Sequence, residues 1–324
     1  MKVRMGLNPY GLTYHLGLQA RGTPRENPNA VGLEGFIALA TEINAKVLEL
    51  PEAWLAETDL AALKQRLDGL DIMPVVSSGL QHGDVDACIS YAQALGTDRI
   101  RFALTPILCG DRAAAGDKWH ELVAGVRAKL GPAAEKAAAA KVMILIENHQ
   151  DFTSRELVAF CEEFGPSVRI VYDTGNNFPV AESPLDFTRV IAPYVRYVHA
   201  KDYNVQFTTE GYRLCRCPSG DGAVPFKELF EILGEHNDEM VAAIEIAALE
   251  ARHVRLFTPD WWHGYAPIPA EQLAAALFAA QRNKLPEDAD YRTPWERNAD
   301  SELAEYEIAQ VRKSAANMRA LGFM

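Results

Sequence analysis

Several features that would assign this 324-residue chain to a common class are missing from its sequence. No apolar run is long enough to cross a membrane, and the N-terminal Met-Lys-Val-Arg-Met-Gly-Leu becomes polar too early for a secretory signal. The five cysteines are scattered and odd in number, which argues against a disulfide framework and favours reduced thiols in the cytoplasm. No G-x-G-x-x-G or Walker pattern follows an apolar run, which disfavours a doubly wound nucleotide-binding sheet.

Basic residues are also comparatively few, since 32 Lys and Arg face 44 Asp and Glu and leave a net charge of −12. Nucleic-acid binders usually carry a basic face, because phosphate contacts supply most of their affinity. A hydrophobic fraction of 48% is nevertheless ample for a globular core. We therefore expect a cytoplasmic protein whose partner is a small molecule rather than nucleic acid or a membrane.

Strand and helix patterns alternate along most of the chain. Short β-branched runs predict eight strands, at residues 3–14 (with the following loop), 46–50, 72–77, 99–103, 142–149, 168–176, 195–202 and 240–246. Apolar residues at helical spacing predict helices at 31–44, 58–69, 84–95, 113–140 (broken at Gly131-Pro132), 153–163, 184–192, 225–235 and 270–281. Eight such units are typical of an α/β fold, the (β/α)₈ TIM barrel, with the helix at 270–281 closing the ring.

Two segments lie outside the eight predicted strand–helix units. Residues 203–224 alternate in polarity between Gly, Pro and Asp residues and predict a small hairpin over the mouth of the barrel. Residues 1–284 would form the barrel, and residues 285–324 a C-terminal extension that becomes helical from about residue 301. The extension has a partly apolar face, which would either dock on the barrel or contact a second subunit in a homo-oligomer.

Four of the predicted strands end in a side chain that can bind a metal or transfer a proton: Glu147, Asp173, His199 and Glu245. Parallel strands of a barrel direct the residues at their C-terminal ends toward one shared mouth. Three carboxylates and an imidazole would repel one another there unless a divalent cation lay among them. The sequence therefore predicts a metal site formed by these four residues.

The residue types in this set indicate which metal and which chemistry to expect. Oxygen-rich ligation with one imidazole suits manganese, magnesium or cobalt better than zinc, which favours nitrogen and sulfur ligands. Such an ion can polarise the carbonyl of a hydroxy-ketone and stabilise an enediolate when a proton leaves the neighbouring carbon. Glu147 and Glu245 are the predicted catalytic residues, as both ligands and proton carriers.

The motifs Ile-Glu-Asn-His (146–149), Tyr-Asp-Thr-Gly-Asn (172–176), His-Ala-Lys-Asp (199–202) and Ile-Glu-Ile (244–246) resemble those of the xylose isomerase-like TIM barrel superfamily. The resemblance spans roughly residues 5–283. It implies an eightfold barrel whose metal is bound by Glu147, Asp173, His199 and Glu245. It also implies that Glu147 and Glu245 handle the proton, as in sugar isomerases and epimerases.

The sequence departs from many epimerases of this family at Asn176, where they carry a histidine, and the His-x-Lys-Asp form is more similar to the dehydratase and acid-processing members. Lys201 is then expected to contact the substrate. Arginines around the predicted mouth are suited to an anionic substrate, because their guanidinium groups bind carboxylate or phosphate. The full set of predicted substrate-binding residues is Lys201, Asn176, His149, Arg213, Arg216, Arg252, Glu49 and His15.

Three enzymatic hypotheses follow. The first is a divalent-metal-dependent isomerase or epimerase that acts on a keto sugar or sugar acid through an enediolate. The second is a lyase, either a dehydratase or a decarboxylase, that uses the same site on an oxidised sugar acid. The third is an endonuclease IV-like enzyme that cleaves abasic DNA, which the negative charge and the shortage of histidine ligands disfavour. A non-catalytic sugar-binding barrel is the alternative outside enzymology.

Overall fold

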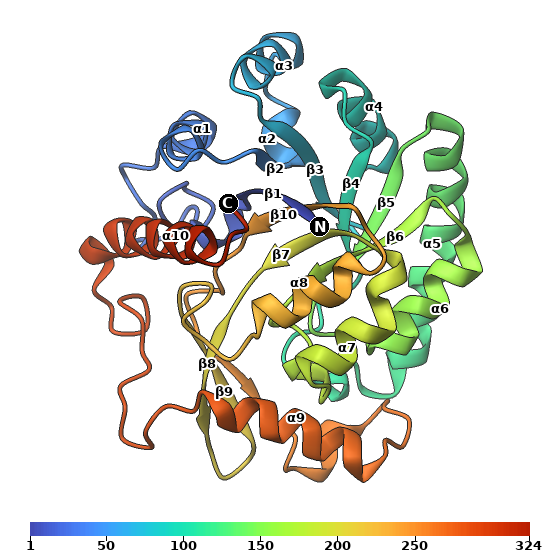
Figure 1. Cartoon of the computed structure of the whole chain (residues 1–324), viewed down its shortest axis with the longest axis vertical. Helices are drawn as coiled ribbons and strands as arrows, with labels where there is room; N and C mark the ends of the chain where they lie inside the picture. The colour runs from blue at the N-terminus through green and yellow to red at the C-terminus, as the bar shows by residue number, and fades with distance from the viewer.

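Eight parallel strands close into a barrel in the computed structural model, which describes residues 1–324 (Figure 1). Neighbouring strands follow one another in chain order, and the ring closes where the last barrel strand pairs with the first along its whole length. The fold class predicted from the sequence is therefore confirmed. The barrel strands are β1 (Lys2–Leu7), β2 (Val47–Pro51), β3 (Met73–Gly79), β4 (Arg99–Ala103), β5 (Met143–Glu147), β6 (Val168–Asp173), β7 (Val195–Ala200) and β10 (Glu239–Ile244).

Helices surround this barrel, and several of them begin at a residue whose side chain caps the free N–H groups of the first turn. Asp59 and Asp84 accept hydrogen bonds from first-turn backbone N–H groups, and Thr153 forms a reciprocal capping box with Glu156. The outer helices are α1 (Gly32–Glu42), α3 (Leu60–Gly69), α4 (Val85–Leu95), α5 (Trp119–Ala140), α6 (Ser154–Phe164), α7 (Pro184–Ile191), α8 (Phe226–Gly234) and α10 (Leu303–Ala320), with the short α2 (Glu52–Leu55) after β2. None of the helices is both long and apolar enough to span a membrane.

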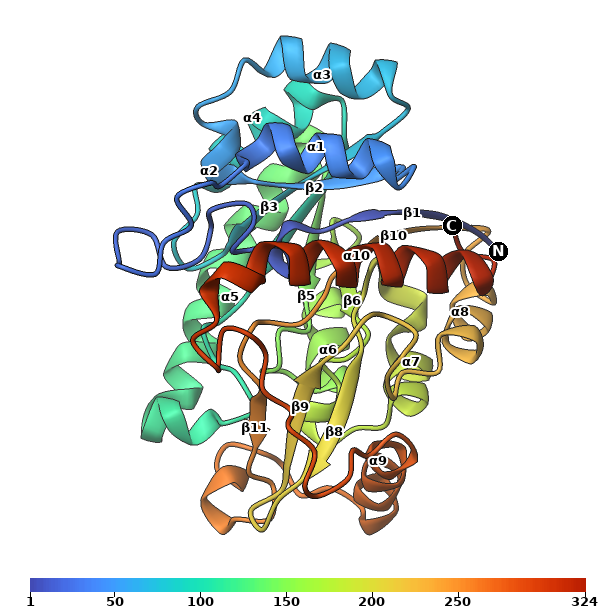
Figure 2. The ribbon, with the colours of Figure 1, turned by 90° about the vertical axis from the view of Figure 1, so that its left-hand side faces the viewer.

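The helix that completes the ring is not the one predicted. The segment 270–281 does form a helix, α9 (Ala270–Arg282), but α9 lies at one end of the molecule beyond the barrel (Figure 2). The place between α1 and α8 is taken by α10, whose Arg312 pairs with Glu42 of α1 (Figure 1). On its other side, Phe323, just beyond α10, packs at a tilt against Phe230 of α8.

A second correction concerns the break predicted at Gly131-Pro132. Helix α5 continues through Pro132 without interruption. Val126 and Leu130 before the proline, and Ala133 and Ala137 after it, are buried against the barrel. This continuous buried face outweighs the loss of one backbone hydrogen bond at the proline.

The inside of the barrel is filled in layers, because alternate residues of a strand point to the same face. An apolar layer is formed by Val47, Val75, Leu145, Val171, Tyr197, Val241 and Ala243. Two residues further along, the same inward face carries polar groups at Glu49, Ser77, Glu147, Asp173, His199 and Glu245. The apolar layer thus supports a polar layer at the C-terminal end of the barrel.

The predicted hairpin in residues 203–224 is present as β8 (Tyr203–Phe207) and β9 (Tyr212–Arg216), which pair antiparallel. A third strand, β11 (Arg252–Val254), joins β9 and completes a small sheet at the end of the barrel (Figure 2). Asp202 fixes the loop that leads out of this sheet, since its carboxylate accepts hydrogen bonds from the N–H groups of Gly220, Gly222 and Val224.

Candidate metal centre and cavity

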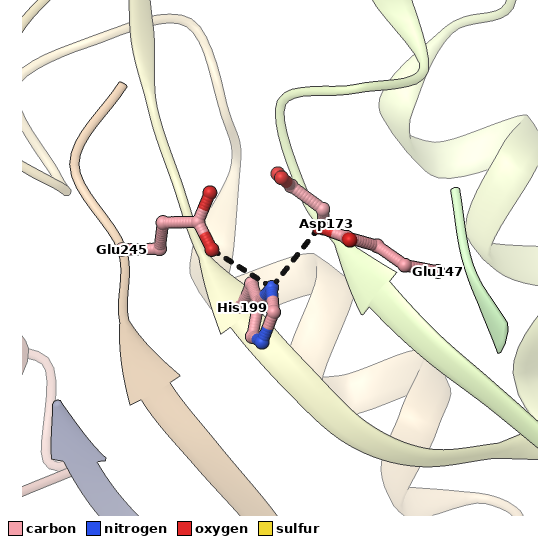
Figure 3. Close-up of side chains that lie close together, drawn as sticks. All are labelled: Glu147, Asp173, His199 and Glu245. Atoms are coloured by element: carbon pink, nitrogen blue, oxygen red, sulfur yellow. Dashed lines mark hydrogen bonds and ion pairs between the residues drawn. The ribbon is translucent and has the colours of Figure 1, made fainter. Parts of the chain in front are cut away.

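The four predicted metal ligands converge. One donor atom from each of Glu147, Asp173, His199 and Glu245 lies within 4.8 Å of the others, and all four residues are buried. Figure 3 shows the carboxylates of Glu147 and Glu245 approaching His199 from opposite sides. Ions with metal–oxygen distances of about 2.0–2.6 Å hold opposite ligands about 4–5 Å apart, so this group could bind a metal with little movement.

His199 is held so that one ring nitrogen faces the carboxylates of Glu147 and Glu245. Its Nε2 lies 2.7 Å from Oε2 of Glu49, and its Nδ1 lies 2.9 Å from Glu245 and 3.3 Å from Glu147. A ligating histidine commonly gives its second N–H to a carboxylate, which fixes the ring and its tautomer. With a proton on Nε2, the Nδ1 lone pair would point into the group. Oε2 of Glu245 is buried without an aligned hydrogen bond, which fits a ligand oxygen.

Two protein cations also enter this group. Lys201 contacts Asp173 and lies 2.5 Å from Oε1 of Glu245, and Arg101 of β4 forms a buried ion pair with Glu147. Burial alone would lower the pKa of Lys201, but Asp173 and Glu245 outweigh it and keep the pKa well above its usual value. Both cations therefore stay charged and balance part of the carboxylate charge.

The carboxylates respond differently to this environment. Burial would raise the pKa of Glu245, but Lys201 and His199 outweigh it and bring the pKa to about 2. For Asp173 burial prevails over Lys201, with Glu245 adding repulsion, and the pKa rises to about 7. Burial would lower the pKa of His199, but Glu49 and Glu245 raise it well above its usual value. His199 is therefore protonated when no metal competes for it.

A cavity of about 530 Å³ opens beside the four ligands. Glu245 and Lys201 form part of its wall, and Arg101 and Tyr203 extend it toward β4 and the small sheet. The other residues that line it are Tyr10, Thr13, Gln19, Ser78, Gly79, Ala103, Leu108, His149, Gln150, Ile246, Ala248, Leu249, Glu250 and Arg252. Its size and many polar groups suit a small hydroxylated ligand.

Three of the eight predicted substrate-binding residues, Lys201, His149 and Arg252, line this cavity. The other five lie elsewhere. Asn176 is buried and donates a hydrogen bond to Asp173, and Glu49 is buried next to His199. Arg213 is bonded to Gln206, while Arg216 donates to the carbonyl oxygens of Gly11 and Ala247.

His15, the fifth, is fixed through its backbone N–H to Glu307 of α10. None of these five side chains lines the cavity.

Arg101 is the main residue of the site that the sequence reasoning did not identify. It lies at an inward position of β4, between Ile100 and Phe102, which pack outward into the helical layer. A charged residue flanked by two apolar ones in a barrel strand is the signal that could have revealed it. Tyr10, Gln150 and Tyr203 also line the cavity, but nothing in their local sequence marks them.

The fold and site together define the class of this protein as a TIM barrel with a carboxylate and imidazole site at the C-terminal ends of its strands. The family described as xylose isomerase-like TIM barrel matches residues 80–261, which is more than half of the chain. The chain therefore belongs to the xylose isomerase-like TIM barrel family.

Individual relatives are more distant. The uncharacterized protein YihM of Escherichia coli (strain K12) is 33% identical over 101 residues, which are 30% of this chain and 31% of that protein, so the match spans about a third of the length of either. D-Psicose 3-epimerase with D-tagatose from Clostridium cellulolyticum H10 aligns with a TM-score of 0.52 at 15% identity and covers 100% of this chain and 99% of its own.

A probable 3-DHS dehydratase, AsbF, involved in petrobactin synthesis in Bacillus anthracis, aligns with a TM-score of 0.54. Its identity is 15%, and the alignment covers 76% of this chain and 92% of the dehydratase. At such low identities, these likenesses support the fold alone.

Proposed function

We propose that this protein is a divalent-metal-dependent isomerase or epimerase that acts on a keto sugar or sugar acid through an enediolate. The observation that carries the proposal is the convergence of four donor atoms within 4.8 Å, directly beside a polar cavity of about 530 Å³. The family assignment and the epimerase fold among its structural neighbours agree with this reading.

The donor set fits a hard or borderline ion. Three carboxylates and one imidazole favour manganese, magnesium or cobalt over zinc. Glu147, Asp173, His199 and Glu245 would hold the ion, and when bound it would polarise the substrate carbonyl and lower the cost of removing the neighbouring proton. Arg101 and Lys201 keep Glu147 and Glu245 ionised, so these two ligands are ready for a cation. Asp173, whose pKa is about 7, has to lose its proton to act as a ligand.

Glu245 is the first proton carrier in this proposal. Its carboxylate lines the cavity and is ionised, because its pKa is about 2. It is therefore placed to accept a proton from the carbon next to a carbonyl. Glu147 is the second proton carrier in this proposal. It is enclosed by its ion pair with Arg101, and it would reach the substrate when that ion pair opens.

The test combines metal removal with isotope exchange. The purified protein is stripped with a chelator, and Mn²⁺, Mg²⁺, Co²⁺ or Zn²⁺ is returned separately. Each form is incubated in D₂O with a panel of ketoses and keto sugar acids. NMR measures the entry of deuterium at the carbon next to the carbonyl. We expect this exchange only when metal is present. Unchanged exchange after complete chelation would sink the proposal.

Two variants separate binding from catalysis. Glu245→Gln should abolish exchange while the protein stays folded, and Asp173→Asn should weaken Mn²⁺ binding measured by calorimetry. Glu182→Gln is a matched control, because Glu182 is also a buried glutamate but bonds to Ser154 and belongs neither to the four ligands nor to the cavity wall. If Glu245→Gln exchanges deuterium as fast as the unmodified protein, Glu245 does not carry the proton.

A lyase acting on an oxidised sugar acid is the second candidate, and one feature favours it. Glu245 and Lys201 line the same cavity and lie 2.5 Å apart, whereas Glu147 does not line it. A base and an acid on the same face of the substrate suit elimination. The carboxylate of Glu245 would take the proton from carbon, and the ammonium of Lys201 would protonate the departing hydroxyl. Epimerisation instead needs proton carriers on both faces.

The two candidates give different products. In the same NMR assay a lyase releases water or CO₂ and forms a product of lower mass, whereas an isomerase keeps the substrate composition. Lys201→Met should stop elimination by removing the acid, yet leave deuterium exchange by Glu245 detectable. Conversion of a keto sugar acid without loss of mass would exclude the lyase.

A further inference from the structure

The polar side chains that line the cavity fall into two groups. Arg101, Lys201, Glu245 and Gln150 are bonded to other protein groups. Arg252 and His149 line the cavity too, but neither side chain forms a hydrogen bond or ion pair within the protein. Arg252 is half-buried. Of the two arginines that line the cavity, Arg101 is paired with Glu147, and Arg252 is the one whose charge has no protein partner. Groups left free in this way are available to a ligand.

The small sheet explains why Arg252 alone of the nearby arginines is free to act. Arg252 pairs with Leu214, and the next residue, His253, pairs with Arg213. Because side chains alternate between faces, Arg252 shares a face with Leu214 and the cavity-lining Tyr203, whereas Arg213 and His253 point the other way. Arg255 is occupied by Asp111 and Asp260 at 3.0 Å each.

The charges of the metal centre do not require Arg252. Glu49, Glu147, Asp173 and Glu245 supply four negative charges, and Arg101, Lys201 and a divalent cation would supply four positive ones. Arg252 is therefore not needed to balance the metal centre, and it lines the cavity together with Tyr203 and Lys201. The only other free charge that lines the cavity is Glu250.

We propose that Arg252 binds the anionic group of the substrate, and that the substrate is an acidic sugar whose carboxylate lies on Arg252 while its hydroxyl end faces the metal centre. This inference rests on the proposed function and narrows its substrate from sugars in general to sugar acids. A planar guanidinium suits a carboxylate, to which it can donate two parallel hydrogen bonds. His149 is suited to a hydroxyl between the two ends, as an unbonded imidazole on the wall.

Direct binding tests the proposal without requiring turnover. D-Glucuronate, its neutral amide D-glucuronamide and glucose 6-phosphate are titrated by calorimetry into the full-length protein loaded with Mn²⁺. We expect D-glucuronate to bind more tightly than the amide. Arg252→Met should weaken D-glucuronate about 10- to 100-fold, the loss typical of a charged hydrogen bond, and leave D-glucuronamide nearly unchanged.

Two further variants guard against an indirect effect. Arg255→Met removes a neighbouring arginine that does not line the cavity, and it should leave D-glucuronate binding unchanged. Glu250→Gln removes the one free negative charge, and it should tighten D-glucuronate binding a few-fold.

Equal affinity for D-glucuronate and its amide, equal loss in the Arg252 and Arg255 variants, or no binding of any probe at millimolar concentration would overturn the assignment. Tighter binding of glucose 6-phosphate than of D-glucuronate would replace the carboxylate by a phosphate and also overturn it. Binding that depends on Arg252 in a protein without exchange activity would support the anion site while counting against the proposed function.

Discussion

Two residues of the same type, Glu49 and Glu245, have different contacts in this site. Glu49 and Glu245 are both buried glutamates that approach His199, one at Nε2 and the other at Nδ1. Glu245 also lines the cavity and contacts Lys201, whereas Glu49 is hidden behind the imidazole. In the proposed metal site, Glu49 would therefore act only by orienting His199.

Replacing Glu49 tests this indirect role. Glu49→Gln keeps the size of the side chain but removes the charge that fixes the proton on Nε2 of His199. We expect Mn²⁺ affinity to fall about 10- to 100-fold, the usual effect of losing such a partner. Calorimetric titration measures the change, with Glu182→Gln as the control. An unchanged Mn²⁺ affinity would mean that Glu49 does not position the ligand.

Metal binding should also depend on pH. His199 is protonated in the absence of metal, because its pKa is held well above the usual value, and the pKa of Asp173 is about 7. Both must lose a proton to act as ligands, so Mn²⁺ affinity should rise as the pH increases from about 6 to about 8, by up to tenfold per unit for each proton released. Titrations in buffers of different ionisation enthalpy count the protons. A flat pH profile would contradict this assignment.

Among the elements, α10 does more than complete the ring. Glu307 on its buried face accepts hydrogen bonds from the backbone N–H groups of Tyr14 (3.2 Å) and His15 (2.7 Å). Ser314 and Asn317 bond to Ser219 in the loop that Asp202 also fixes. The helix therefore holds two loops at the mouth of the barrel, one of which carries the cavity residue Thr13.

Glu307 should make stability depend on pH. Burial raises its pKa to about 7, against the opposing effect of Arg216 and two backbone N–H groups. At pH values between about 4.5, the ordinary pKa of a glutamate, and about 7, Glu307 keeps a proton in the folded protein that it has lost in the unfolded chain. Stability from this group is thus full below about pH 4.5 and falls as the pH rises toward 7, by up to about 3 kcal/mol.

The measurement is urea unfolding at a series of pH values. Glu307→Gln cannot titrate, so its unfolding free energy should fall less between pH 5 and pH 7 than that of the unmodified protein. Glu305→Gln, an exposed neighbour on the same helix, should retain the full pH dependence. Identical slopes for the two variants would show that Glu307 titrates normally.

At the scale of the whole molecule, the barrel and the C-terminal residues share one core. Val311, Ala315 and Met318 of α10 belong to the same buried cluster as the outward faces of the barrel strands. The division into a barrel of residues 1–284 and an extension of residues 285–324 stays a prediction, as do the homo-oligomer and the cytoplasmic location.

Truncation addresses this division. A chain that ends at residue 302 loses α10 and exposes the apolar surfaces that Val311, Ala315 and Met318 cover. We expect it to aggregate and to unfold at a clearly lower temperature, because a large buried apolar area is lost. Thermal unfolding and size-exclusion chromatography measure both effects. A soluble barrel with an unchanged unfolding temperature would mean that residues 1–284 form an independent unit.

The sequence by itself determined the eight strands and the four converging residues. Each of Glu147, Asp173, His199 and Glu245 follows an inward apolar residue by two positions, and strands of period two bring such residues to one level of the barrel. This pattern is local, so it could be read without knowing the packing. The hairpin at residues 203–224 was predictable for the same reason.

Only the tertiary structure decided which helix completes the ring and which cations reach the cavity. The segments 270–281 and 303–320 both form helices with buried apolar residues, and only the structure shows that the second of them lies between α1 and α8. Arg252 and Arg213 look equivalent in the sequence, but antiparallel register directs one into the cavity and the other away from it. Register and long-range packing join residues far apart in the chain, and no local pattern encodes them.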